Sequence, residues 1–116
     1  MGFQKKDDTF RLLKEEVLEW INFSGRAMIP IIQKVRIKNP LGLHARPATV
    51  IAKLLQTSRS NVTFTYRKVT INPRSIMSIL MLSASKNSQI TITVEGEDAN
   101  ETLKKLVGAF ETKFGE

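Results

Sequence analysis

Residues 39–48 read Asn-Pro-Leu-Gly-Leu-His-Ala-Arg-Pro-Ala, and this stretch decides where a strand ends and a helix begins. Pro40 and Gly42 are typical of a tight turn. Pro47 has no backbone N–H, so a helix accommodates it only in the first turn. The sequence therefore predicts a turn followed by a helix, with His44 at or next to the N-cap.

This predicted helix start favours an anion. The first N–H groups of a helix lack intrahelical partners and carry partial positive charge, and Arg46 adds planar donors that match a phosphate. A neutral imidazole is a competent nucleophile near pH 7, so the arrangement suits a phosphoryl group carried on His44. A lone histidine at a helix end more often has a structural role, and from these residues alone both interpretations stay open.

The rest of the chain alternates between strand and helix patterns. Apolar residues recur at every second position in 34–38, 62–66, 69–71 and 90–94, which predicts four strands. Helical spacing predicts three helices, one after His44, one over 75–82, and one after Asp98, which occupies the cap position of a capping box with Glu101. The order β-α-β-β-α-β-α predicts an α+β fold, an open-faced sandwich with the helices on one face of the sheet.

The N-terminal segment differs from this pattern. Gly25 and Pro30 interrupt the chain, and residues 1–29 contain apolar side chains at helical spacing: Phe10, Leu13, Val17, Trp20 and Ile21. We therefore predict an amphipathic helical extension over 1–29 and a separate domain over 30–116. The extension has three possible roles: packing on its own domain, pairing with a copy of itself, or docking a partner.

The composition of the 116 residues excludes several kinds of site. There is no cysteine and only one histidine, so disulfides, Cys-ligated zinc and multi-histidine metal sites are excluded, and we expect no cofactor. No apolar run approaches the length of a membrane span, and charged residues interrupt the first 30 positions, unlike a secretory signal. We expect a cytoplasmic protein that does not insert directly into a membrane.

The net charge of +7 is unevenly distributed. No acidic residue occurs between Glu19 and Glu95, whereas eleven Lys and Arg residues do. Such a surface attracts an acidic partner, a phosphorylated species or nucleic acid. The sequence lacks an RNP-type aromatic cluster, a GxxG clamp and a zinc finger, so we do not expect nucleic acid as a partner.

Two segments of the sequence resemble a known family. Residues 42–47, Gly-Leu-His-Ala-Arg-Pro, resemble the active-site signature of HPr, the histidine-containing phosphocarrier of the phosphoenolpyruvate-dependent sugar phosphotransferase system. Residues 74–77, Arg-Ser-Ile-Met, resemble the regulatory segment of that family at the same spacing. The resemblance runs from about Ile31 to Phe114, and the N-terminal extension is atypical.

The resemblance implies a fold and a function. The fold is a four-stranded antiparallel sheet with three helices on one face, here preceded by an extra N-terminal helix. His44 would accept a phosphoryl group on Nδ1 from phosphorylated enzyme I and pass it to sugar-specific acceptor domains, with assistance from Arg46. Ile76 and Met77, with Arg46 and Lys53 around them, would form a docking patch. The protein would be a carrier and not an enzyme.

Ser75 supports an alternative function. A serine that opens a helix is ordinarily an N-cap, whereas in Gram-positive members of the family the matching serine is phosphorylated by a kinase, which regulates carbon catabolism. Ser78 departs from the glycine that many relatives have. The alternative is an HPr-fold regulatory binding protein that acts through Ser75, with a serine kinase as partner, or through the N-terminal helix.

Overall fold

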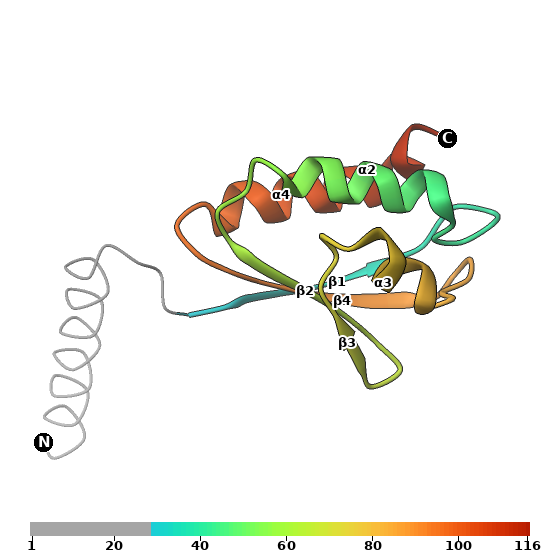
Figure 1. Ribbon diagram of the computed structural model, residues 1–116, viewed down its shortest axis with the longest axis horizontal. Coiled ribbons are helices and arrows are strands. Elements are labelled where there is room, and N and C mark those ends of the chain that lie inside the picture. The colour runs from blue at the N-terminus through green and yellow to red at the C-terminus, as the bar shows by residue number, and fades with distance from the viewer. Residues whose placement is uncertain (1–28) are drawn as a thin grey trace, which may run out of the picture.

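The computed structural model describes residues 29–116 (Figure 1). The helix predicted in residues 1–29 therefore lies, apart from Ile29, outside the described residues, and it stays a prediction together with the division at residue 30. The described elements follow the predicted order and end in a short 3-10 helix, η1: β1 (Ile31–Arg36), α2 (Ala45–Leu55), β2 (Asn61–Tyr66), β3 (Val69–Ile71), α3 (Ile76–Met81), β4 (Gln89–Glu95), α4 (Ala99–Glu111) and η1 (Lys113–Gly115).

The four strands form one antiparallel sheet in the order β1-β4-β2-β3. Central strand β4 pairs Ile92 with Gln33 of β1 on one side and with Phe64 of β2 on the other. Successive side chains of a strand point to opposite faces, so the alternating apolar residues all reach one face. These residues are buried: Val35, Val62, Phe64, Ile90, Ile92 and Val94.

The helices cover that apolar face, which confirms the open-faced α+β fold. Figure 1 shows α2 and α4 side by side along one side of the sheet; α4 contacts β1 and β4, and α3 packs beside α2. The Phe110 ring of α4 packs edge-to-face against two other rings. Its centroid lies 5.9 Å from that of Phe64 in β2 and 4.8 Å from that of Phe114 in η1. The aromatic cluster therefore links the sheet to the end of the chain.

The predicted capping box is only partly right. Asp98 is the N-cap residue of α4, but its side chain makes no cap hydrogen bond. Its carboxylate instead accepts from the Ser60 hydroxyl and, at 3.0 Å, from the Arg59 N–H. Ser60 is buried, so its hydroxyl needs a partner, and this long-range demand outweighs the local cap. These two hydrogen bonds, chiefly that from Ser60, lower the pKa of Asp98.

The apolar residues of α3, and Leu82 after it, are divided between the core and the surface. Ile79 and Leu82 are buried, whereas Met77 and Met81 are 67% and 77% exposed. This division leaves an apolar surface on α3. No helix within residues 29–116 has the length and hydropathy needed to cross a bilayer.

Candidate functional site

His44 lies at the beginning of α2. It is the N-cap residue, with extended backbone angles, and the helix begins at Ala45. The His44 carbonyl accepts the first helical bond from the Ala48 N–H at 3.0 Å, and Pro47 is buried in the first turn. The N–H groups of Ala45 and Arg46 therefore lie outside the helical ladder, as expected of a helix start that attracts an anion.

The turn before His44 is fixed by Gly42. Its φ is +70°, and a Cβ at this position would lie 2.3 Å from the Ala84 carbonyl oxygen, so only glycine fits. The N–H of Gly42 donates to the Asn39 carbonyl, and that of Leu43 to Ala84, each at 3.0 Å. The first bond closes the turn, and the second ties the loop that carries His44 to the segment after α3.

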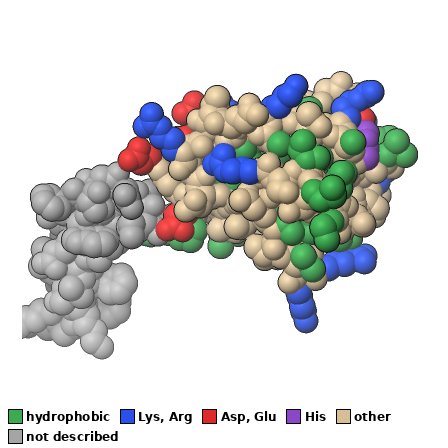
Figure 2. Space-filling view, viewed as in Figure 1, with side chains coloured by type: hydrophobic (Ala, Val, Ile, Leu, Met, Phe, Trp, Pro, Cys, Tyr) green, Lys and Arg blue, Asp and Glu red, His purple; other side chains and the backbone are tan. Residues whose placement is uncertain are grey.

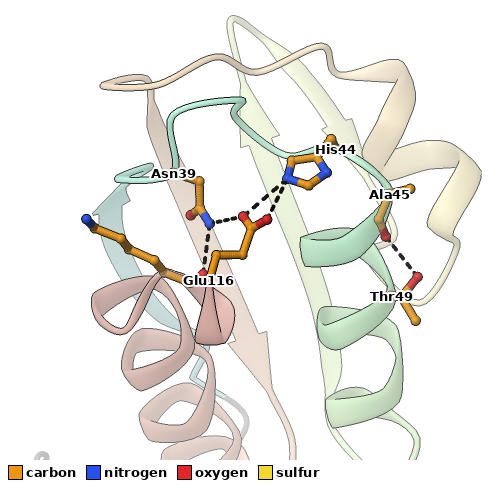
Figure 3. Close-up of polar contacts among 6 residues, drawn as sticks. Asn39, His44, Ala45, Thr49 and Glu116 are labelled. Atoms are coloured by element: carbon orange, nitrogen blue, oxygen red, sulfur yellow. Dashed lines mark hydrogen bonds and ion pairs between the residues drawn. The ribbon is translucent and has the colours of Figure 1, made fainter.

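The side chain of Glu116 contacts the His44 ring (Figure 3). Its two carboxylate oxygens lie 3.0 and 3.2 Å from Nε2 of His44. The buried Asn39 side chain donates to the same carboxylate, and at 2.8 Å to the Lys113 carbonyl. If the Asn39 amide were reversed, its oxygen would face the Glu116 carboxylate and the Lys113 carbonyl, which are both acceptors. These contacts therefore determine the orientation of the amide.

An unusual backbone turn brings Glu116 to this position. Lys113, Phe114 and Gly115 all have positive φ, at 56°, 55° and 82°, and the first two are not glycine. Positive φ costs roughly 1 kcal/mol or more in a residue with a Cβ. The buried Phe114 ring, packed against Phe110, offsets that cost and holds the turn in place.

The carboxylate of Glu116 is held in its ionised form. Desolvation raises its pKa, but hydrogen bonds from Asn39 and His44, with the charges of His44 and Arg46, lower the pKa below its ordinary value of 4.5. An ionised carboxylate only accepts hydrogen bonds, so the contact requires the ring proton on Nε2. In the neutral ring, Nδ1 then keeps its lone pair, and Figure 3 shows it on the side away from Glu116, toward the start of α2.

The predicted site residues come together on two neighbouring helices. The His44 side chain is 31% exposed, so a partner can reach it, and Arg46 and Lys53 are exposed on α2. Within residues 29–116, the Arg46 side chain forms neither an ion pair nor a hydrogen bond, so its donors are available to a ligand. Ile76 and Met77 are exposed on α3, which packs on α2.

Three residues of the site were not predicted. Asn39 belongs to residues 39–48, but none of its sequence neighbours indicated that its side chain would contact Lys113 and Glu116. Glu116 is 72 positions away from His44 and gave no sequence signal. Leu41 is 78% exposed in the turn before His44, where an exposed leucine is a signal for docking that the sequence contained.

Ser75 is half-buried and has the capping role that its position predicted. Its Oγ accepts from the Ser78 N–H at 3.2 Å at the start of α3. The neighbouring Arg74 side chain donates to the carbonyls of Leu55, Ser58 and Ser60. Arg74 therefore links α3 to the end of α2, and its guanidinium is engaged by the backbone.

No group of three or more His, Cys, Asp or Glu side chains in the described part of the chain is arranged to hold a metal ion. The candidate site therefore consists of a histidine whose ring is oriented by a carboxylate, a helix start, a free arginine and an apolar surface beside them.

Comparisons with known proteins find similar chains over most of the described residues. Residues 31–112 match the family model described as "PTS HPr component phosphorylation site". The phosphocarrier protein HPr of Chlamydia muridarum is 48% identical over 80 residues, which cover 69% of this chain and 77% of that relative. HPr of Chlamydia pneumoniae is 45% identical over 80 residues, covering 69% of this chain and 74% of the relative. A crystal structure of HPr from Thermoanaerobacter tengcongensis superposes with a TM-score of 0.71 and 35% identity, covering 74% of this chain and 97% of that one.

Proposed function

The chain belongs to the HPr family of phosphocarrier proteins of the phosphotransferase system, and we propose that it carries the phosphoryl group on Nδ1 of His44. The observation that carries this proposal is the contact of 3.0 Å between the Glu116 carboxylate and Nε2, with Nδ1 on the opposite side of the ring. Glu116 acts as a positioning residue, because it holds the ring proton on Nε2 and so leaves the Nδ1 lone pair free.

The transfer exchanges one bond to phosphorus for another. The Nδ1 lone pair of His44 attacks the phosphorus of phosphorylated enzyme I, and the bond between phosphorus and the donor breaks with its electron pair returning to the donor. The Nε2 proton stays in place, and the Glu116 carboxylate offsets the positive charge that develops on the ring. In the second step a sugar-specific acceptor domain attacks the same phosphorus, and Nδ1 recovers its lone pair.

The helix start and Arg46 stabilise the phosphoryl group between the two steps. The N–H groups of Ala45 and Arg46 are outside the helical ladder, and the Arg46 guanidinium is free in the described residues. This surface is exposed, so its interactions with the phosphoryl group are weakened by water and do not trap it. A carrier needs this balance, because a phosphoryl group that is held too strongly would not reach the acceptor.

The docking patch, Ile76 and Met77 with Arg46 and Lys53 around them, supports the binding of enzyme I and of the acceptors in turn. It lies on the helices that flank His44, and exposed apolar side chains ringed by charge are typical of protein contacts. Leu41 adds a further exposed apolar side chain in the turn before His44. We assign the exchange to the cytoplasm, as the family implies.

Regulation through Ser75 is the second candidate function. Ser75 caps the helix that carries Ile76 and Met77, so a phosphate on its hydroxyl would add nearly two negative charges beside the docking patch. An acidic partner would then bind more weakly. Because Arg74 is engaged by backbone carbonyls, it is not free to neutralise such a phosphate.

The test is phosphoryl transfer from phosphoenolpyruvate through the cognate enzyme I, followed by ³¹P NMR. The full chain is compared with His44→Ala, and with Ser75→Ala as the matched control. We expect an acid-labile phosphohistidine in the full chain and in Ser75→Ala, and none in His44→Ala. Absence of phosphorylation of the full chain by an active enzyme I would overturn the carrier proposal and leave the regulatory candidate.

A further inference from the structure

Three strained backbone positions lie around one end of the β2–β3 hairpin and α3. Tyr66 pairs with Val69, so Arg67 and Lys68 form a two-residue turn, with φ of 48° and 67°. Such turns favour Asn-Gly, because L residues with long side chains are strained at positive φ. Ser83, just after α3, also has a positive φ of 50°. Strain of this kind gathers at functional sites more often than elsewhere.

A shallow pocket lies between these strained positions. We call it the hairpin pocket; its volume is about 230 Å³, and it is lined by Tyr66, Arg67, Val69, Met81, Leu82 and Ser83. Val69 is 53% exposed and Met81 is 77% exposed. Figure 2 shows apolar side chains over α3 that continue toward the hairpin, with Lys and Arg side chains beside them.

The charge around the hairpin pocket has one sign. Arg67 lines the pocket, Lys68 follows it in the same turn, and none of the lining residues is acidic. All Asp and Glu residues in the described part of the chain lie at positions 95–116, in the end of β4 and beyond. A pocket that combines the apolar side chains of Val69 and Met81 with the charge of Arg67 fits an acidic segment that presents an apolar side chain.

We propose that the hairpin pocket is a second docking contact for the phosphoryl donor, which inserts an apolar side chain flanked by carboxylates. This inference rests on the proposed phosphocarrier function and goes beyond the docking patch beside His44. The donor fits better than an acceptor because it arrives phosphorylated and therefore more negative. The acceptor meets a carrier whose own positive field is reduced by its phosphoryl group.

Other occupants fit the hairpin pocket less well. Residues 1–28 contain five basic and five acidic residues, so this segment offers no net charge complementary to the rim. A second copy of the chain has the same net charge of +7, so its charge is not complementary to the rim. Single-stranded nucleic acid needs a free aromatic face, whereas the Arg67 guanidinium lies over the Tyr66 ring at 5.1 Å from its centre.

Because the hairpin turn is strained, one double variant should raise the stability of the protein and weaken its binding to the donor at the same time. The double variant Arg67→Asn/Lys68→Gly replaces both residues with those that the turn prefers and removes two charges. We expect its melting temperature to rise by about 5 °C. We also expect the KM for phosphorylation by the cognate enzyme I to rise about fivefold, with a shallower salt dependence and an unchanged kcat. A merely structural hairpin would gain stability without losing donor affinity.

Three further variants separate the local charge of the hairpin, its apolar contact and the net charge of the whole chain. Arg67→Gln/Lys68→Gln removes the charges but keeps the strain, and Val69→Thr removes apolar contact with little change of shape; both should raise KM. Lys104→Gln/Lys105→Gln removes two charges from α4, away from the hairpin, and should leave KM nearly unchanged.

The outcomes distinguish this inference from the proposed function. If enzyme I phosphorylates the full chain and all hairpin variants have the wild-type KM, the second contact does not exist and the carrier function stands. An equal rise of KM in the α4 variant would reduce the effect to net charge and overturn the inference. Impaired transfer to the acceptor alone would also overturn the assignment to the donor. If the full chain is not phosphorylated at all, the proposed function itself has failed.

Discussion

Replacing Phe114 with alanine tests whether the strained chain end positions the candidate nucleophile. Phe114 is buried against Phe110, and this packing holds a turn in which Lys113 and Phe114 have positive φ. Without the ring, the turn loses its anchor, and we expect the last residues to leave the surface. Glu116 then no longer contacts His44, although the first turn of α2 is unchanged.

The expected loss of stability follows from two opposing contributions. Removing a buried phenylalanine costs about 4 kcal/mol. Release of the turn returns roughly 1 kcal/mol for each of the two non-glycine residues at positive φ. The expected global loss is therefore about 2 kcal/mol, the difference between these two contributions. For a domain of this size, the melting temperature should fall by about 10 °C.

Two assays read the consequence for His44. Side-chain ¹⁵N shifts above pH 8 report which ring nitrogen carries the proton, and we expect the Nε2–H form to lose its predominance in Phe114→Ala. Phosphorylation by enzyme I should slow about tenfold, because the ring is no longer oriented. Glu116→Gln is the matched comparison, since it keeps the Phe114 anchor and should show the kinetic loss with little change in melting temperature.

The reasoning is refuted if Phe114→Ala lowers the melting temperature but keeps both the Nε2–H form and the wild-type rate. The chain end would then be a stabilising element only, and Glu116 would have no part in orienting His44.

Asp98 should make stability depend on pH in the acid range. Its pKa is lowered in the folded state, so its contribution to stability is complete above the ordinary value of 3.8 and is lost as pH falls through the folded pKa. Chemical denaturation should show Asp98→Asn less stable than wild type at pH 7, with a difference that shrinks as the pH falls below 3.8. In urea titrations, Gly42→Ala should lower the free energy of unfolding by at least about 2 kcal/mol, because it adds strain at φ +70° and a contact of 2.3 Å with the Ala84 carbonyl oxygen. Gly115→Ala should lower it by only about 1 kcal/mol, because no atom lies within 4 Å of the added Cβ. Ser75→Asp should raise the KM for enzyme I while Ser75→Asn, which keeps a capping side chain, leaves it close to wild type; equal values for the two variants would contradict the charge argument.

The sequence was sufficient to predict the order in which strands and helices follow one another along the chain. Alternation at every second residue identified the strands, because each apolar residue of Val62, Phe64, Ile90, Ile92 and Val94 has to reach the same face of the sheet. Likewise, Pro47 fixed the beginning of α2 and so placed His44 at the N-cap, since proline restricts the backbone wherever it occurs. Both inferences depend on residues that are close in sequence.

The capping prediction at Asp98 was wrong for the side chain because the decisive partner was distant. The local pattern of Asp98 and Glu101 is that of a capping box, and Asp98 does hold the cap position. The buried Ser60 hydroxyl, 38 positions earlier, takes the carboxylate instead. A buried donor without a partner costs more than an exposed cap contributes, so the tertiary contact prevails.

By itself, the sequence determined the α+β fold, the helix start that carries His44 and the long basic stretch without acidic residues between Glu19 and Glu95. The resemblance implied Nδ1 of His44 as the accepting nitrogen, but only the tertiary structure revealed the contact that orients the ring. That contact is made by Glu116, which approaches the ring through the aromatic packing of Phe114 and the buried amide of Asn39. Contacts across 72 positions of chain follow from how the core closes, and no local pattern of residues encodes them.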